Sequence, residues 1–377
     1  MTRWRDWARG ELDGLRAQGR FRSVRTFDAH GPAGRLQGRD VVSFASNDYL
    51  GLTTHPAVVA AAHEALDRWG TGSGASRLIV GSRPGHDELE HDLADWKGAE
   101  RALLLPTGFA ANLAVLTVLA GPDVLVCSDE LNHASIIDGC RLARAKVEVF
   151  PHRDLDHLAA LLAAADRPAV VVSDTVFSMD GDLADVAGLA ELCARHDALL
   201  VLDEAHAVLG PELPPEVGAE VVRVGTLSKM LGALGGFVVG AAPIIDLLVN
   251  RARPFIFTTA PTPADTAAAR AALAVLRSPE GDALRARLRH AVERVRPGHP
   301  SPIVPVVLGH EDVALAASAR LLEQGILVPA IRPPTVPPGT SRLRVALSAA
   351  HTDEMLDALL GALAGLGVLS GGGRSPS

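Results

Sequence analysis

Residues 198–206 read Ala198-Leu199-Leu200-Val201-Leu202-Asp203-Glu204-Ala205-His206, an apolar run that stops at two carboxylates and a histidine. A short apolar run of this kind is typical of a buried strand. Ligands of open α/β sheets bind at the carboxyl ends of such strands. We therefore expect Asp203 and His206 at the edge of a sheet, facing a binding site. Taken alone, the same tetrapeptide is equally consistent with a helix-capping aspartate and a surface histidine.

Strands and helices alternate through the first three quarters of the chain. Helix-period runs at residues 57–69 and 186–196 alternate with short apolar runs at 169–173, 198–202 and 221–224. This alternation is typical of βαβ units. It predicts an α/β fold with a large, mainly parallel sheet.

The regular alternation of predicted strands and helices ends at about Pro279. A strand-like run at 303–308 and a helical run near 314–323 precede a final pair of elements, which indicates a small α+β domain. The last residues are rich in Gly, Ser and Pro, a composition typical of disorder. The predicted organisation is an N-terminal segment 1–45, a large domain 46–279, a small C-terminal domain 280–369 and a disordered tail 370–377.

Lys229 lies in an apolar, glycine-rich run, residues 226–236, that follows a strand-like segment. Burial favours the neutral amine of a lysine, and a neutral amine forms a Schiff base with a carbonyl. A bound aldehyde cofactor would use such a group. A single lysine at a strand end more often keeps its charged head in water, so the interpretation depends on its companions.

The companions of Lys229 match the needs of pyridoxal phosphate. This cofactor requires an anion against its pyridinium nitrogen and a donor near its phenolic oxygen, and Asp203 and His206 offer both. Residues 106–112 form a small-residue turn that opens a helix, where free N–H groups favour a phosphate. His133, in the run 128–135 after another strand, could lie flat on a ring. A plain βα turn and a solvated histidine are the alternatives for these two motifs.

Several runs together resemble the α-oxoamine synthases, pyridoxal-phosphate enzymes that join a small amino acid to an acyl thioester and release carbon dioxide. The runs are residues 46–52, 70–77, 107–112, 177–182, 203–206 and 226–229, and they recur in family order. The resemblance extends from about residue 10 to residue 360. It implies a large domain of the fold-type I pyridoxal-phosphate transferase kind and a homodimer with shared active sites.

The resemblance also implies roles around the cofactor. Lys229 would bind the aldehyde, Asp203 would pair with the pyridinium nitrogen, and His206 would contact the phenolic oxygen. His133 would stack on the ring. The remaining cofactor contacts would come from Gly108 and Phe109 through backbone donors, from Ser178 and Thr226 through hydroxyls, and from Thr258 and Thr259 in the partner subunit.

For the substrates, the resemblance assigns Arg344 to the amino-acid carboxylate, a task suited to a planar two-pronged donor. Asn47 and Thr335 match substrate-contacting positions, and Arg22 matches an arginine that contacts the acyl substrate. Without the resemblance, residues 342–347 alternate as a strand that places charged side chains on its wet face. That alternative would make Arg344 an ordinary surface residue.

Within the family, residues 333–352 and 177–182 look most like the branch that condenses L-alanine with a pimeloyl thioester, carried by coenzyme A or a carrier protein, in biotin biosynthesis. A sibling enzyme using glycine and acetyl-CoA, or another pair of substrates, is the alternative. A pyridoxal-phosphate-fold protein without turnover is a further alternative. Residues 207–217 depart from the family pattern, which leaves the preferred acyl chain length open.

The composition excludes several classes of protein. A net charge of −8 argues against a general nucleic-acid binder. The three cysteines lie far apart, which favours neither a disulfide framework nor a metal site and fits a reducing cytoplasm. No apolar stretch approaches the ~18 residues of a membrane span. We therefore expect a cytoplasmic protein without a membrane anchor.

The first 25 residues reverse the overall charge. They hold seven arginines against three acidic residues, a balance suited to the phosphates of coenzyme A or to an acidic carrier protein. The alternative is a solvated amphipathic helix that turns Trp4, Trp7, Leu12 and Leu15 inward.

Overall fold

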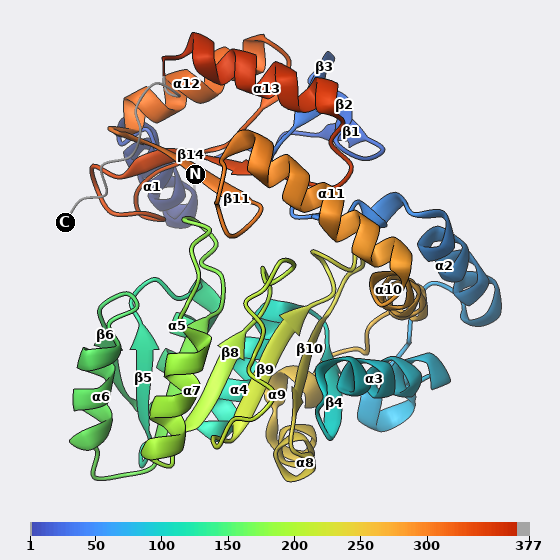
Figure 1. Cartoon of the computed structure of the whole chain (residues 1–377), viewed down its shortest axis with the longest axis vertical. Helices are drawn as coiled ribbons and strands as arrows, with labels where there is room; N and C mark the ends of the chain where they lie inside the picture. Colours follow the sequence, from blue (N-terminus) through green and yellow to red (C-terminus); the bar gives the residue numbers. More distant parts are fainter. Residues whose placement is uncertain (1, 368–377) are drawn as a thin grey trace.

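The computed structural model describes residues 2–367, and its centre is a seven-stranded sheet in the order β4-β10-β9-β8-β7-β5-β6 (Figure 1). The strands are β4 (Arg101–Leu105), β5 (Leu125–Asp129), β6 (Lys146–Phe150), β7 (Ala169–Asp174), β8 (Leu199–Asp203), β9 (Val221–Thr226) and β10 (Gly236–Gly240). β10 runs antiparallel to β4 and β9, and the other neighbours pair in parallel. The predicted α/β class with a mainly parallel sheet is confirmed.

Helices cover both faces of this sheet because its strands are apolar on both sides. Val170 and Val172 of β7 pack with the cluster beneath α4 (Gly108–Leu119), α5 (Ala134–Ala143) and α8 (Ala242–Arg251). Val171 points the other way, into the cluster beneath α6 (Leu155–Ala163) and α7 (Val186–Arg195). Successive side chains of a strand face opposite sides, so a continuous apolar run fills two cores at once.

The C-terminal region forms smaller sheets above the edge of the large one. β11 (Ile303–Gly309), β14 (Ser341–Ala346) and β13 (Ala330–Ile331) make an antiparallel sheet. β1 (Phe27–Ala29), β2 (Ala33–Leu36), β3 (Arg39–Ser43) and β12 (Ile326–Leu327) make another, in which β12 runs parallel to β3. Strands from the start of the chain therefore share a sheet with the C-terminal region, a pairing that chain order does not indicate.

The C-terminal helices are α11 (Pro279–Val295), α12 (Glu311–Glu323) and α13 (Asp353–Gly365). Together with β11 to β14 they form the expected α+β arrangement. α12 begins earlier than the predicted run at 314–323 because the His310 side chain caps it by accepting a hydrogen bond from the Asp312 N–H.

A group of segments joins the two regions at one side of the molecule. These are η1 (Leu52–Thr54), α2 (Pro56–Trp69), η2 (Arg77–Gly81), α3 (Pro84–Lys97), α9 (Arg253–Ile256) and α10 (Pro263–Leu276). α10 packs against both α2 and α3 (Figure 1). The predicted helical runs at 57–69 and 186–196 correspond to α2 and α7.

The N-terminal helix α1 (Arg3–Ala17) buries none of its residues. Trp4 is 75% exposed, and Trp7, Leu12 and Leu15 are exposed as well. The interpretation that these side chains turn inward is therefore wrong for the single chain, since no other element within residues 2–367 covers this apolar face. Within residues 2–367, no helix combines the length and the apolar character that crossing a membrane requires.

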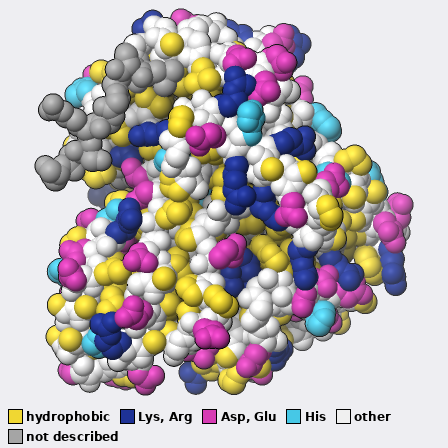
Figure 2. All heavy atoms as spheres, in the orientation of Figure 1, with side chains coloured by type: hydrophobic (Ala, Val, Ile, Leu, Met, Phe, Trp, Pro, Cys, Tyr) yellow, Lys and Arg dark blue, Asp and Glu magenta, His cyan; other side chains and the backbone are white. Residues whose placement is uncertain are grey.

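Charges of both signs are mixed over the face of the molecule that Figure 2 shows. Figure 2 shows acidic and basic side chains interspersed over one face rather than gathered into a basic patch. This arrangement agrees with the net charge of −8.

Glu204 anchors the end of β8 from inside the protein. Its carboxylate is buried and lies 2.7 Å from Lys97 Nζ and 2.5 Å from Arg223 Nε. Burial raises the pKa of this carboxyl, but Lys97 and Arg223 outweigh burial, so the pKa of Glu204 lies below its ordinary value. The strand end therefore depends on a buried pairing of one anion with two cations.

We predict that Glu204→Ala lowers the free energy of unfolding by about 3–5 kcal/mol, because it leaves two buried cations without their anion. Glu191→Ala removes one partner of an exposed pair with Arg195 and should cost less than ~1 kcal/mol. Urea unfolding followed by circular dichroism measures both. Equal losses in the two variants would contradict the central role of this ion pair.

Candidate functional site

A cavity of about 260 Å³ lies at the carboxyl edge of the large sheet. It is bounded by the ends of β8 and β9 and by the first residues of α4 and α5. Most of the cofactor-contacting residues expected from the sequence line it: Gly108, Phe109, His133, Ser178, Asp203, His206, Thr226 and Lys229. Residues that are up to about 120 positions apart in the chain thus meet in one small space.

The floor of the cavity is acidic. Asp203 is buried, and its carboxylate accepts hydrogen bonds from the Ala205 N–H (2.9 Å) and from Asn112 Nδ2 (2.6 Å). Asp174, the residue paired with Asp203 on β7, is buried as well. Burial and the neighbouring Asp203 raise the pKa of Asp174 well above its ordinary value. Two adjacent buried carboxyl groups that resist joint ionisation favour a cationic ligand.

Asp174 and Asn112 were not selected from the sequence. Asp174 follows the apolar run 169–173 just as Asp203 follows 198–202, so the same signal could have found it. Asn112 is the last residue of the run 107–112. Its role as a donor to Asp203 depends on the first turns of α4 reaching the end of β8, which a local pattern does not reveal.

The opposite end of the cavity is suited to an anion. Thr107 caps α4 by accepting a hydrogen bond from the Ala110 N–H (3.0 Å). The first N–H groups of a helix have no intrahelical acceptor, and here those of Gly108 and Phe109 lie at the cavity. A Cβ on Gly108 would approach Thr226 Cβ to 3.2 Å, so glycine keeps this wall open. The Thr226 and Ser228 hydroxyls are 2.7 Å apart on the same wall.

Lys229 and His206 both line the cavity, and their side chains are in direct contact. Lys229 Nζ lies 2.9 Å from His206 Nε2. Burial lowers the pKa of Lys229. Burial and the nearby Lys229, Arg344 and His133 hold the pKa of His206 well below its ordinary value. The amine therefore reaches its nucleophilic neutral form at lower pH than a free lysine, beside a neutral imidazole.

Arg344, on β14, does not itself line the cavity but contacts Ser178, which does. Its Nε donates to the Ser178 carbonyl (2.5 Å), and its two Nη atoms lie 3.2 and 3.3 Å from Asn47 Oδ1. Every residue of β14 is buried, so the alternative that places Arg344 on a wet face is wrong. Because other elements cover both sides of this strand, the alternation of charged and apolar residues does not predict which side chains are exposed to solvent. Within residues 2–367, no ion pair includes Arg344.

Besides Arg344 and Asn47, four further expected site residues do not line the cavity in the single chain. Thr258 and Thr259 follow α9 at the surface, next to the exposed Phe257. Thr335 and Arg22 are exposed. None of the four lines the cavity, and their roles stay predictions.

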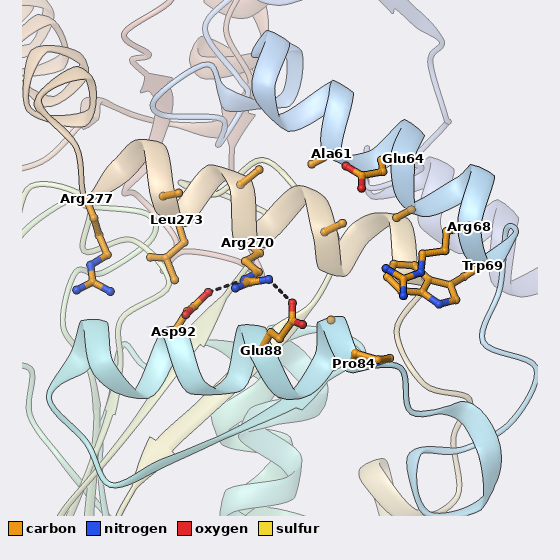
Figure 3. A pocket seen from close by; sticks show the side chains of 15 residues that line it. Ala61, Glu64, Arg68, Trp69, Pro84, Glu88, Asp92, Arg270, Leu273 and Arg277 are labelled. Atoms are coloured by element: carbon orange, nitrogen blue, oxygen red, sulfur yellow. Dashed lines mark hydrogen bonds and ion pairs between the residues drawn. The ribbon is translucent and has the colours of Figure 1, made fainter.

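A larger cavity of about 730 Å³ lies elsewhere, between α2, α3 and α10 (Figure 3). Its charged side chains largely neutralise one another, since Arg270 pairs with Glu88 and Asp92. None of the residues expected to carry chemistry lines it. We therefore place the candidate active site at the smaller cavity.

His152 braces the loop that carries Ser178. Its Nδ1 lies 3.0 Å from Asp129 Oδ1 and its Nε2 lies 2.7 Å from Asp182 Oδ2. Burial lowers the pKa of His152, but the two carboxylates outweigh burial and raise it to about 9. The ring also meets the Phe177 ring edge-on, with centroids 4.3 Å apart. A protonated imidazole therefore ties the loop at 177–182 to the ends of β5 and β6.

Comparisons with known proteins agree with this geometry. The aminotransferase class I and II family matches residues 39–363. The 8-amino-7-oxononanoate synthase of Anaeromyxobacter dehalogenans is 50% identical over 95% of both chains. A serine palmitoyltransferase structure from S. paucimobilis, with a bound PLP–myriocin aldimine, is 30% identical with a TM-score of 0.89 over 96% of this chain and 98% of that one. An 8-amino-7-oxononanoate synthase from Francisella tularensis is 26% identical, with a TM-score of 0.71 over 86% and 96%.

The His152 bridge predicts a pH-dependent loss of stability. Because the pKa of His152 is raised to about 9, its stabilising contribution is complete below its ordinary pKa of about 6.5 and disappears as the pH rises through 9. His152→Asn should lower the free energy of unfolding by about 2 kcal/mol at pH 6 and by much less at pH 10. His157→Asn, at an exposed position of α6, serves as the control. A pH-independent difference between wild type and His152→Asn would refute the bridge.

Proposed function

This chain belongs to the aminotransferase class I and II family, in its 8-amino-7-oxononanoate synthase branch, and from that premise we propose that it condenses L-alanine with a pimeloyl thioester. The products are 8-amino-7-oxononanoate, carbon dioxide and a free thiol, in biotin biosynthesis. The observation that carries this proposal is the buried Arg344, a cation without an acidic partner in residues 2–367, which donates to the carbonyl of Ser178 in the wall of the cavity that holds Lys229. A buried guanidinium of this kind is suited to a substrate carboxylate.

The cavity fits pyridoxal phosphate. Among the residues that the structure describes, the hydrogen-bond donors to the Asp203 carboxylate are neutral, so it can pair with a protonated ring nitrogen. The start of α4, with Gly108 and Phe109, suits the phosphate. Among the described residues, no hydrogen-bond partner contacts the buried Asn112 Oδ1, which leaves an acceptor available in the cavity wall. When bound, the cofactor supplies an electrophilic aldehyde and an electron sink for carbanion chemistry.

Side chains of this protein would bind the cofactor and the substrate and move the substrate proton. Lys229 would hold the aldehyde of the cofactor, and once the amino group of alanine has replaced it there, the freed neutral amine would be placed to remove the α-proton as a general base. Asp203 would pair with the protonated ring nitrogen of the cofactor, and His133 would stack on its ring. Arg344 and Asn47 fix the carboxylate of alanine until it leaves as carbon dioxide, after the new carbon–carbon bond has formed.

The proposal includes a homodimer with shared active sites. Thr258 and Thr259 would reach the phosphate bound by the partner subunit. An exposed apolar surface adjoins them: Phe257 is 70% exposed and Ile79 of η2 is 74% exposed. The segment at 257–260 is hydrogen-bonded to the segment that leads into η2, because the Ala260 N–H donates to the Ala75 carbonyl (3.0 Å).

For the acyl donor, Thr335 and Arg22 would contact the substrates, and the basic N-terminal segment suits either coenzyme A or an acidic carrier protein. The cytoplasm is the expected compartment, since the three cysteines are buried free thiols and a reducing environment keeps such thiols intact.

We predict that purified protein is yellow with pyridoxal phosphate and that Lys229→Ala is colourless. The chain contains only three lysines, Lys97, Lys146 and Lys229. Borohydride reduction followed by peptide mapping should therefore find the cofactor on Lys229 alone. Lys146→Ala, with an exposed side chain, should keep the colour. Wild-type protein that binds no pyridoxal phosphate would overturn the proposed function.

A substrate panel separates this reaction from those of sibling enzymes. Alanine, glycine and serine are each offered with pimeloyl-, acetyl- and succinyl-CoA, and carbon dioxide and free thiol are measured. We expect alanine with pimeloyl-CoA to give the highest kcat/KM. Release with glycine and acetyl-CoA, and none with alanine and pimeloyl-CoA, would assign the chain to a sibling reaction.

A further inference from the structure

Tyr49 connects the cofactor cavity to the carboxylate-binding arginine. It is the only tyrosine of the chain and its side chain is fully buried. Its hydroxyl lies 2.6 Å from His206 Nδ1 and 3.1 Å from Asn47 Oδ1. His206 continues to Lys229, and Asn47 continues to Arg344. The Tyr49 hydroxyl therefore lies between the pair His206 and Lys229 and the pair Asn47 and Arg344.

Arg344 fixes the orientation of Asn47. A guanidinium only donates hydrogen bonds, so the Asn47 atom that faces its two Nη atoms is the oxygen. That oxygen already has donors without Tyr49. In contrast, His206 Nδ1 has no other hydrogen-bond partner in the described part of the chain.

The Tyr49 hydroxyl has one proton and two acceptors within reach. The contact to His206 is 0.5 Å shorter, since the two distances are 2.6 and 3.1 Å. A buried nitrogen that lacks a partner costs more than a carbonyl oxygen that keeps other donors. Both comparisons favour a proton directed at His206 Nδ1. The neutral imidazole then carries its own proton on Nε2, the nitrogen that faces the cavity.

We propose that Tyr49 is a positioning residue that donates to His206 Nδ1 and thereby keeps the His206 proton on Nε2, where it can be donated to the phenolic oxygen of the cofactor. This inference rests on the proposed function, which places that oxygen beside His206. Burial raises the pKa of Tyr49 to about 12, so the hydroxyl keeps its proton over the working pH range. The contact with Asn47 places the same hydroxyl beside the amino-acid carboxylate.

The direct test observes the tautomer in folded wild-type protein. Protein labelled with ¹⁵N-histidine and loaded with pyridoxal phosphate is studied by NMR, and the His206 signals are assigned by their loss in His206→Asn. A proton on Nε2 supports the proposal. A proton on Nδ1 overturns it, and this measurement does not depend on the folding of a Tyr49 variant.

The variant Tyr49→Phe keeps the ring and removes the hydroxyl. We expect kcat to fall roughly tenfold or more, because a buried hydrogen bond to a reacting group is lost. The pH midpoint of the visible absorbance of the bound cofactor should move by about one unit, a shift that loss of packing would not cause. Thr266→Val removes another buried hydroxyl, which donates to the Thr262 carbonyl on α10, and should change neither quantity.

The outcomes separate this inference from the proposed function. An active, yellow wild type with an unchanged absorbance midpoint and kcat in Tyr49→Phe overturns the role of Tyr49 alone. A wild type that binds no cofactor overturns the proposed function and the role of Tyr49 with it.

Discussion

The buried carboxylate of Asp203, at the end of β8, is the constraint on which the candidate site depends. A buried carboxylate needs compensation if it is ionised, yet its hydrogen-bond partners among residues 2–367 are an amide and a backbone N–H, both neutral. The neighbouring Glu204 has two cations of its own, Lys97 and Arg223. The same strand end thus holds one anion that is paired within the fold and one that is left for a cationic ligand.

The parallel sheet explains why this anion is accessible. The carboxyl ends of β7, β8 and β9 reach the same edge, and helices that follow such strands start there with their positive ends. An acidic floor and an anion-binding wall can therefore lie within one small cavity. Lys229, just after β9, is placed between them, and burial lowers its pKa.

The second half of the site comes from the C-terminal region. Arg344 is carried by β14, but its contacts reach Ser178 in the loop after β7 and Asn47 near the start of the chain. His152 holds that same loop to the large sheet through Asp182. The loop at 177–182 is thus tied to both regions, and it brings Arg344 into contact with a residue that lines the cavity.

The sequence by itself determined the alternation of strands and helices, the strand ends that carry Asp203 and Lys229, and the glycine turn at Gly108, because these depend on local periodicity and turn chemistry. It also indicated Arg344, but only through the resemblance to a known family. The alternation of charged and apolar residues in 342–347 does not show whether the charged side chains face solvent or are buried. Tertiary structure alone decided the pairing of β3 with β12, the buried partners Asp174, Asn112 and Tyr49, and the exposure of Trp4 on α1. Those features depend on contacts between residues tens to hundreds of positions apart, and no local pattern encodes which distant surface will cover a side chain.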